Sequence, residues 1–193
     1  MELISSSIKK QLNSMNEQLT QLYKEIKDCK GCPKTQWASG HKEIGWGSPG
    51  EILFIGESPA FTSLTLKEGD SRFDKSFKSL LKEAGIYDKD YFFTNVVKFP
   101  PIRDIDLMDS SDRKHCYDHL MEEIELIDPV VIVTLGTKSA NLMRDFIFPA
   151  KHRLLHPGAI KYGTITREQY VQKLKEINEI YRKLKVVKHN KLV

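Results

Sequence analysis

Three polar side chains suited to acid–base chemistry and base recognition stand at the ends of short apolar runs. Glu57 follows residues 51–56, Asn95 lies within the run 91–98, and His156 closes the run 153–156. A carboxylate, an amide and an imidazole can together exchange a proton, pair with a polar ligand and stabilise developing negative charge. If these runs are parallel strands of one sheet, their carboxyl ends bring the three side chains to one crevice, where open α/β sheets bind ligands.

Cysteines form a second group of candidate residues. Cys29 and Cys32 make a C-x-x-C pair, and Cys116 is the third and last cysteine of the chain. Three cysteines cannot form a closed set of disulfides. In a reducing compartment such a pair indicates a metal-binding or redox site first.

Hydrophobic patterning predicts the elements that must position these residues. Short apolar runs between turn-forming residues predict strands over residues 51–56, 91–98, 130–135 and 153–156. Apolar residues at helical spacing, with Gly and Pro as stop signals, predict helices over residues 2–28, 73–84, 111–127, 137–146 and 167–184.

The order of these elements predicts an α/β fold, a three-layer α/β/α sandwich with a central, mostly parallel four-stranded sheet. A chain of 193 residues suits one domain, 1–193, with an N-terminal helix in 1–28. Residues 32–50 are rich in Gly and Pro and predict a long loop. The basic tail 185–193 is expected to fray.

Composition narrows the class of protein. The chain is 40% hydrophobic and 29% charged, as is usual for a soluble globular protein, and its net charge of +4 permits a polyanionic partner. The sequence contains neither an apolar run of membrane-spanning length nor a secretory signal pattern. We therefore expect a cytoplasmic monomer that does not associate with membranes.

The motifs, taken in order, resemble those of the family 4 uracil-DNA glycosylases, the iron–sulfur branch of their superfamily. The resemblance covers roughly residues 29–160. It rests on C-x-x-C, GSPGEILFIGESPA, YFFTNVVKFPP, Cys116 ahead of LIDPVVIVTLGTKSANLM, and LLHPGA. Each motif is weakly specific, whereas their shared order and spacing is a strong signal.

The resemblance implies a role for each matching residue. Asn95 would read the polar edge of the flipped base, and His156 would stabilise negative charge on the departing base. Phe73 is the candidate to stack on the base, with Phe61 and Phe77 as alternatives. The remaining base-binding residues would be Gly56, Ser58, Pro59 and Ala60. The loop that wedges into DNA would contain Pro157, Gly158 and Ile160.

The sequence departs from the family at a carboxylate. The family motif continues as GEAPG-x-x-E, and Ser63 stands where its last glutamate would be. Glu57, Glu68 and Asp70 are nearby acids, so one of them could orient water or stabilise the oxocarbenium-like sugar. We take Glu57 and Asp70 as the catalytic candidates beside His156.

The cysteine pattern also departs from the family. A cysteine would follow NVVK in the family, and Phe99 stands there instead. Cys29, Cys32 and Cys116 remain as candidate ligands of a 4Fe-4S cluster or of zinc, with His41 or His115 as a possible fourth ligand. A site that has lost its metal is an equal alternative.

Taken together, the residues predict a monofunctional DNA glycosylase that flips uracil or a modified base from single- or double-stranded DNA and hydrolyses its N-glycosidic bond. Modified bases such as those of some phage DNA are an alternative substrate. A second hypothesis is a nucleic-acid-binding module that kept the fold without catalysis. A nucleotide-binding enzyme ranks last, because the chain has no phosphate-binding glycine loop.

Each of these residues also has a structural interpretation. Glu57 and Asn95 could cap turns, His156 could be a loop residue, and Phe73 could belong to the core.

Overall fold

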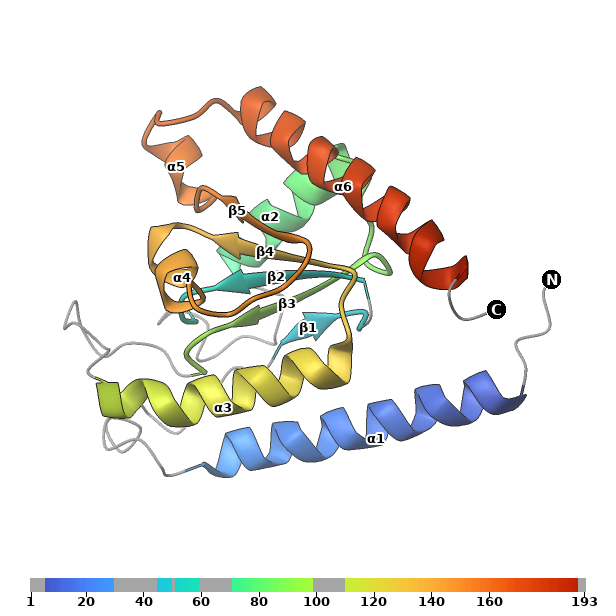
Figure 1. Cartoon of the computed structure of the whole chain (residues 1–193). Coiled ribbons are helices and arrows are strands. Elements are labelled where there is room, and N and C mark those ends of the chain that lie inside the picture. Colours follow the sequence, from blue (N-terminus) through green and yellow to red (C-terminus); the bar gives the residue numbers. More distant parts are fainter. Residues whose placement is uncertain (1–5, 30–44, 50, 60–70, 99–109, 191–193) are drawn as a thin grey trace.

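The structure is a computed structural model that describes residues 6–29, 45–49, 51–59, 71–98 and 110–190 (Figure 1). Its helices are α1 (Ser6–Asp28), α2 (Arg72–Glu83), α3 (Ser110–Ile127), α4 (Thr137–Leu142), α5 (Gly158–Lys161) and α6 (Arg167–Asn190). Its strands are β1 (Trp46–Gly47), β2 (Ile52–Gly56), β3 (Tyr91–Asn95), β4 (Val131–Leu135) and β5 (Lys151–Leu154).

The strands form one sheet in the order β1-β3-β2-β4-β5. Strands β3, β2, β4 and β5 are parallel, and β1 pairs with β3 in the antiparallel direction. The predicted α/β fold with a mostly parallel sheet is confirmed, with five strands in place of four. The additional strand is two residues long and lies within the segment predicted as a loop, so it leaves no periodic signal in the sequence.

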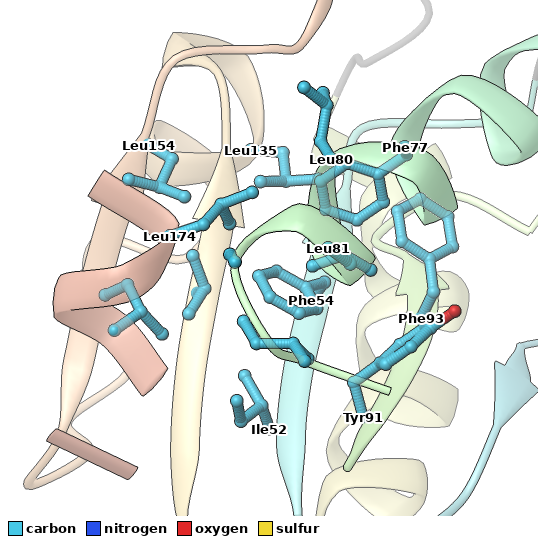
Figure 2. Packing of buried hydrophobic residues seen from close by; sticks show 14 of the residues in the cluster. Ile52, Phe54, Phe77, Leu80, Leu81, Tyr91, Phe93, Leu135, Leu154 and Leu174 are labelled. Carbon is cyan, nitrogen blue, oxygen red and sulfur yellow. The ribbon is translucent and has the colours of Figure 1, made fainter. Parts of the chain in front are cut away.

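Helices cover both faces of the sheet (Figure 1). Alternate residues of a strand point to opposite faces. Phe54 of β2 therefore packs towards α2 and α6, and Ile55 packs towards α3. On the first face, Figure 2 shows Phe54 close to Phe77 of α2, and the two rings meet edge to face with centroids 5.2 Å apart. The three predicted layers are thus present.

A capping box fixes the beginning of helix α2. The Ser71 side chain accepts a hydrogen bond from the Asp74 backbone N–H, and the Asp74 carboxylate accepts one from the Ser71 N–H, at 3.1 and 2.9 Å. Both residues are buried. Such a box satisfies two N–H groups that the helix itself leaves free, so it defines where the first turn begins. That turn contains Phe73.

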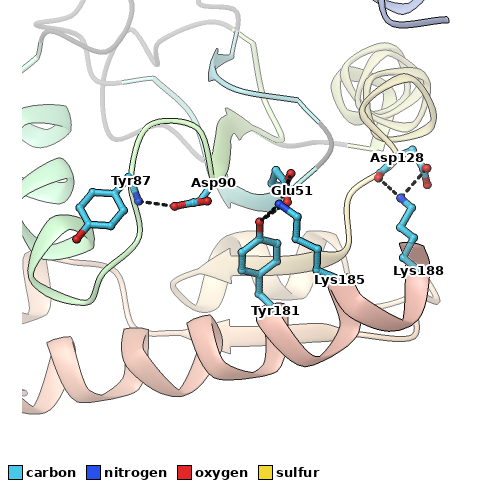
Figure 3. Close-up of polar contacts among 7 residues, drawn as sticks. All are labelled: Glu51, Tyr87, Asp90, Asp128, Tyr181, Lys185 and Lys188. Carbon is cyan, nitrogen blue, oxygen red and sulfur yellow. Dashed lines mark hydrogen bonds and ion pairs between the residues drawn. The ribbon is translucent and has the colours of Figure 1, made fainter. Parts of the chain in front are cut away.

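The C-terminal helix extends beyond the predicted end at residue 184. The expectation of a frayed tail from residue 185 is wrong for Lys185 and Lys188, because both lie in α6 and bind acids at the amino ends of strands (Figure 3). Lys185 pairs with Glu51 before β2 at 2.8 Å, and Lys188 pairs with Asp128 before β4 at 2.6 Å. The Tyr181 hydroxyl also donates a hydrogen bond to Glu51.

Two further differences affect the segment that contains His156. Strand β5 spans Lys151–Leu154, so His156 lies beyond its end and not within it. The short helix α5, which was not predicted, begins directly after Pro157. No helix in the described part of the chain is long and apolar enough to cross a membrane.

Candidate functional site

The candidate site lies at the carboxyl ends of β2, β3 and β4, on the face of the sheet that α2 and α6 cover. We call Gly56, Glu57, Phe73, Asn95 and His156 the strand-end site. Gly56 and Asn95 are direct partners in the register of β2 and β3. A Cβ atom placed on Gly56 would lie 2.4 Å from Asn95 Oδ1. Only glycine at this position leaves room for the Asn95 amide.

Asn95 combines burial with free hydrogen-bonding capacity. The residue is only 6% exposed, yet its side-chain amide makes no hydrogen bond to any other residue that the structure describes. An asparagine amide offers two N–H donors and a carbonyl acceptor. The amide is not among the fully buried polar groups that lack a partner, so its atoms keep some contact with solvent. A ligand with both a donor and an acceptor could replace that solvent and pair with the amide.

Phe73 and Phe93 connect Asn95 to His156. A Cβ on Gly56 would lie 3.3 Å from Phe93 Cζ, and the Phe93 ring centroid lies 5.7 Å from that of Phe73. The His156 ring in turn stacks on Phe73, with a centroid separation of 5.3 Å and an interplanar angle of 21°. The structure therefore brings Asn95, Phe73 and His156 into one neighbourhood, as the sequence predicts.

The hydrogen bonds of His156 define which of its ring nitrogens carries a proton. The Gly158 backbone N–H donates to His156 Nδ1 at 3.1 Å. Because Nδ1 accepts this bond, it carries no proton, and the neutral ring has its proton on Nε2. Gly158 suits this position because a Cβ there would lie only 3.0 Å from Nδ1.

The surroundings of His156 favour the neutral ring. Desolvation lowers the pKa of His156 below its ordinary value of 6.5, and the negative charge of Glu57 acts in the opposite direction. His156 is itself an exposed residue, so this desolvation is partial; it disfavours the charged form of the ring, whereas a nearby carboxylate favours it. Desolvation is the larger effect here, so His156 is a neutral N–H donor near pH 7.

Gly136, directly after β4, lies against His156. A Cβ on Gly136 would lie 3.3 Å from His156 Cβ, and the Gly136 φ angle is +92°. Close approach and positive φ both favour glycine. The GTK segment that follows β4 is therefore part of the site.

Glu57 is half-buried and forms an ion pair with Lys138, with 3.2 Å between Oε1 and Nζ. Lys138 lies in the first turn of α4, three residues after the end of β4, and is 74% exposed. Lys138 was not among the predicted site residues. The rule that strand ends converge could have found it, because Lys138 follows the third parallel strand.

Other predicted base-binding residues are only partly described. Ser58 is half-buried and Pro59 is buried, both directly after Glu57. The following lie outside the described residues: Ala60, Phe61, Ser63, Glu68 and Asp70.

The predicted wedge segment differs in exposure from residue to residue. Pro157 is buried, and Ile160 is half-buried and packs against the core on the α2 and α6 face. Tyr162, directly after α5, is 80% exposed. The prediction of Ile160 rests on its apolar character, but exposure depends on tertiary packing, which no local pattern reveals.

The predicted metal ligands are described for two of three cysteines. Cys29 is half-buried directly after α1, and Cys116 is buried on α3. Figure 1 places the end of α1 and the start of α3 at the same end of their layer. Within the described ranges, no three His, Cys, Asp or Glu residues lie close enough together to hold a metal ion. Cys32, His41 and Phe99 lie outside those ranges, as does the side chain of His115.

The available cysteines do not fit a four-iron cluster held by cysteine alone. Such a cluster takes four thiolates, and the whole chain has three.

The sequence is similar to those of known DNA glycosylases. The sequence model of the uracil DNA glycosylase superfamily matches residues 45–185. The Type-4 uracil-DNA glycosylase of Archaeoglobus fulgidus is 28% identical over 191 residues, covering 85% of this chain and 94% of that protein. The Type-4 enzyme of Sulfurisphaera tokodaii is 26% identical and covers 85% of each chain. That of Thermotoga maritima is 29% identical over 135 residues, covering 67% of this chain and 68% of its own.

Proposed function

Since the chain belongs to the uracil-DNA glycosylase superfamily, we propose that it excises uracil from DNA by hydrolysing the bond between the base and the deoxyribose. The single observation that carries this proposal is the Asn95 side chain, which is 6% exposed, makes no hydrogen bond to another described residue and lies against Gly56. The relatives are named as glycosylases that act on uracil, and uracil has the donor and acceptor edge that such an amide can pair with.

Asn95 would recognise the base once it has left the DNA stack. The amide N–H groups would donate to the uracil O4, and the amide carbonyl would accept from the uracil N3–H. A cytosine base presents an amino group in place of O4 and lacks the N3–H. It would therefore leave the asparagine mismatched, which is the source of discrimination.

His156 would assist the departure of the base. When the bond between C1′ and N1 breaks, its electron pair stays on the base, and negative charge develops on the uracil O2. The Nε2–H of the neutral imidazole would donate a hydrogen bond to that oxygen. A neutral donor keeps its proton, so the base leaves as an anion and is protonated later by solvent.

Glu57 would act on the sugar side of the reaction. Loss of the base leaves positive charge on the deoxyribose, and water then bonds to C1′ and gives up a proton. A carboxylate close to C1′ can stabilise that positive charge and orient the attacking water. Glu57 is the half-buried carboxylate of the strand-end site. Asp70 stays a second candidate, from the sequence alone.

The DNA wedge would be formed by the segment after His156. Pro157 and Gly158 would shape the loop, and we assign the inserted side chain to Tyr162 in preference to Ile160. Tyr162 is 80% exposed, whereas Ile160 packs against the core. An aromatic ring at the surface can stack on neighbouring bases and occupy the gap left by the flipped nucleotide.

The cysteines would form a metal site separate from this chemistry. Cys29, Cys32 and Cys116 would hold iron or zinc, and a bound metal would stabilise the fold where α1 ends and α3 begins. No step proposed above depends on it.

The direct test of this function uses oligonucleotides that carry different bases. Purified protein is incubated with single- and double-stranded DNA containing uracil, hypoxanthine, xanthine or modified pyrimidines, and the products are heated in alkali, which breaks abasic sites. Strand cleavage on uracil-containing DNA is the expected result. Binding in a gel-shift assay without cleavage on any base would favour the non-catalytic binding module.

A further inference from the structure

A buried cluster of charged and polar groups lies behind the strand-end site, on the opposite face of the sheet. Lys98 Nζ lies 2.6 Å from both Glu123 Oε2 and Thr94 Oγ1, and Thr94 Oγ1 donates to the same carboxylate oxygen at 2.8 Å. Thr94, Lys98 and Glu123 are 1%, 2% and 0% exposed. We call these three residues the Thr94 cluster.

The Thr94 cluster is joined to the site through the backbone. Thr94 precedes Asn95 in β3, and adjacent strand residues point to opposite faces. Thr94 therefore faces Glu123 of α3, while Asn95 faces Gly56. Fixing the Thr94 side chain fixes the peptide that sets the direction of the Asn95 amide.

The chain after Asn95 is held in the same way. The Val96 N–H donates to the Gly56 carbonyl at 3.0 Å, and the Val97 N–H donates to the Glu57 carbonyl at 2.9 Å. Lys98 then returns its ammonium group to Thr94. The segment 94–98 is thus closed on itself by Lys98 and tied to the backbone of both Gly56 and Glu57.

A buried ion pair is a costly way to stabilise a core. Removing two charges from water costs as much as or more than their attraction returns, and well-packed apolar residues often serve stability equally well. Glu123 Oε1 has no hydrogen-bond partner among the described residues, which adds to this cost. The directional bonds of the cluster supply what apolar packing cannot, a fixed geometry at the exit of β3.

We propose that the Thr94 cluster is a positioning device that holds the Asn95 amide in the orientation that selects the base. The inference rests on the proposed function, because it gives Asn95 its role in base recognition. Thr94 acts through Asn95 and does not itself touch the DNA.

The sheet provides a matched control. Thr94 of β3 and Thr134 of β4 are both register partners of Ile55, one on each side of β2, and they are 1% and 2% exposed. Thr134 Oγ1 donates to the His152 carbonyl at 3.3 Å and belongs to no charged cluster. Thr94→Val and Thr134→Val each remove one buried hydroxyl at the same level of the sheet.

The experiment compares Thr94→Val, Thr94→Ser and Thr134→Val with the wild-type protein. We expect Thr94→Val to lower kcat on the preferred base by about tenfold, with KM changed by no more than about twofold, since misplacement of a recognition group acts mainly on the transition state. Thr94→Ser, which keeps the hydroxyl, should recover most of the rate. Thr134→Val should stay close to wild type.

A second readout does not depend on catalysis. The side-chain N–H signals of Asn95 in a ¹H–¹⁵N NMR spectrum should move in Thr94→Val and stay in place in Thr94→Ser and Thr134→Val. If Thr94→Val does not fold, Glu123→Asp serves instead, because it keeps the charge while withdrawing the carboxylate by one methylene, and the same signals should move.

The outcomes separate the two proposals. A wild-type protein that releases no base from any oligonucleotide contradicts the proposed function, and the Asn95 signals then decide the positioning role alone. Unmoved Asn95 signals in Thr94→Val, or equal effects of Thr94→Val and Thr134→Val on rate, would overturn the positioning proposal.

Discussion

The ring of His156 stacks on the ring of Phe73 with centroids 5.3 Å apart, so a residue after β5 and a residue of the first turn of α2 form one stacked pair. Phe73 also stacks on Phe77, with centroids 5.7 Å apart, which anchors the pair to the core. His156, the proposed donor to the departing base, is therefore held in place by Phe73. The position of Phe73 is fixed in turn by the capping box at the start of α2.

Replacing Phe73 should affect His156 directly. Phe73→Leu removes the ring that covers one face of the imidazole, so the pKa of His156 should rise towards 6.5 and the excision rate should fall by about tenfold. NMR titration of the imidazole and single-turnover kinetics measure the two effects. Phe73→Tyr keeps the ring and is the control. An unchanged pKa in Phe73→Leu would show that the stacking does not shield His156.

The pH dependence of excision should report the neutral form of His156. Because desolvation lowers the pKa of His156, its neutral form persists below pH 6.5, and the acid limb of the rate profile should have its midpoint below that value. Glu57 raises this pKa, so Glu57→Gln should move the midpoint to still lower pH.

His156→Ala should reduce the rate by roughly 10²- to 10³-fold while DNA affinity changes little. Single-turnover rates over a pH series provide the test, and an acid limb that persists in His156→Ala would assign it to another group.

Folding stability should follow the same titration. The folded-state pKa of His156 is lowered, so below pH 6.5 the unfolded chain takes up its proton more readily than the folded protein does. The contribution of His156 to stability is therefore complete above pH 6.5 and is lost as the pH falls through the two pKa values.

Substitution of Asn95 should change which base is preferred. Asn95→Ala leaves the polar edge of the flipped base unmatched, at a cost of roughly 1–3 kcal/mol in the excision of uracil. Asn95→Asp cannot donate to a uracil carbonyl but can accept from the amino group of a cytosine-like base, so it should change the ranking of the base panel. A ranking that is the same in the wild type and both variants would show that Asn95 does not read the base.

Variants of Tyr162 and Ile160 distinguish which of the two side chains is inserted into the DNA. Tyr162→Ala should reduce excision from double-stranded DNA by about tenfold, with a smaller effect on single-stranded DNA, because less unstacking is needed there. Ile160→Ala should mainly lower the thermal unfolding temperature, because Ile160 packs against the core. Fluorescence of 2-aminopurine beside the uracil follows base flipping directly. The reverse pattern, with flipping lost in Ile160→Ala alone, would return the role to Ile160.

The metal content of the purified protein tests whether the cysteines bind metal. If the cysteines hold metal, purified protein should contain iron or zinc in stoichiometric amount, and Cys29→Ser should lower both the metal content and the unfolding temperature, because metal binding contributes to folding free energy. Absorbance spectra and elemental analysis distinguish iron from zinc. Metal-free protein with full activity would mean that the cysteines are remnants of a lost site.

Much of the site could be predicted because it depends on where parallel strands end. The apolar runs before Glu57 and around Asn95 are visible in the sequence, and the sheet brings Gly56 and Asn95 into register. The stacking of Phe73 on His156 could not be predicted from spacing, because the two residues come from elements 83 positions apart in the chain. Lys138 and Tyr162 were missed because ion pairing and exposure are tertiary properties.

The errors in the fold have similar physical causes. Strand β1 and helix α5 have two and four residues, too few to show a periodic pattern. The last turns of α6 look like a basic tail when only neighbouring residues are considered. Their helical state is stabilised by Glu51 and Asp128, which lie 134 and 60 residues earlier.

The late position of α6 has a consequence for biosynthesis. Leu174 and Tyr181 of this helix complete the core over the same face of the sheet as Phe54, whose strand is made more than a hundred residues earlier. While the chain emerges from the ribosome, that apolar face stays uncovered until α6 has been synthesised, which is the condition under which nascent chains aggregate or engage chaperones. Shortening the chain within α6 should therefore reduce the yield of soluble protein, although α6 contributes no residue to the strand-end site.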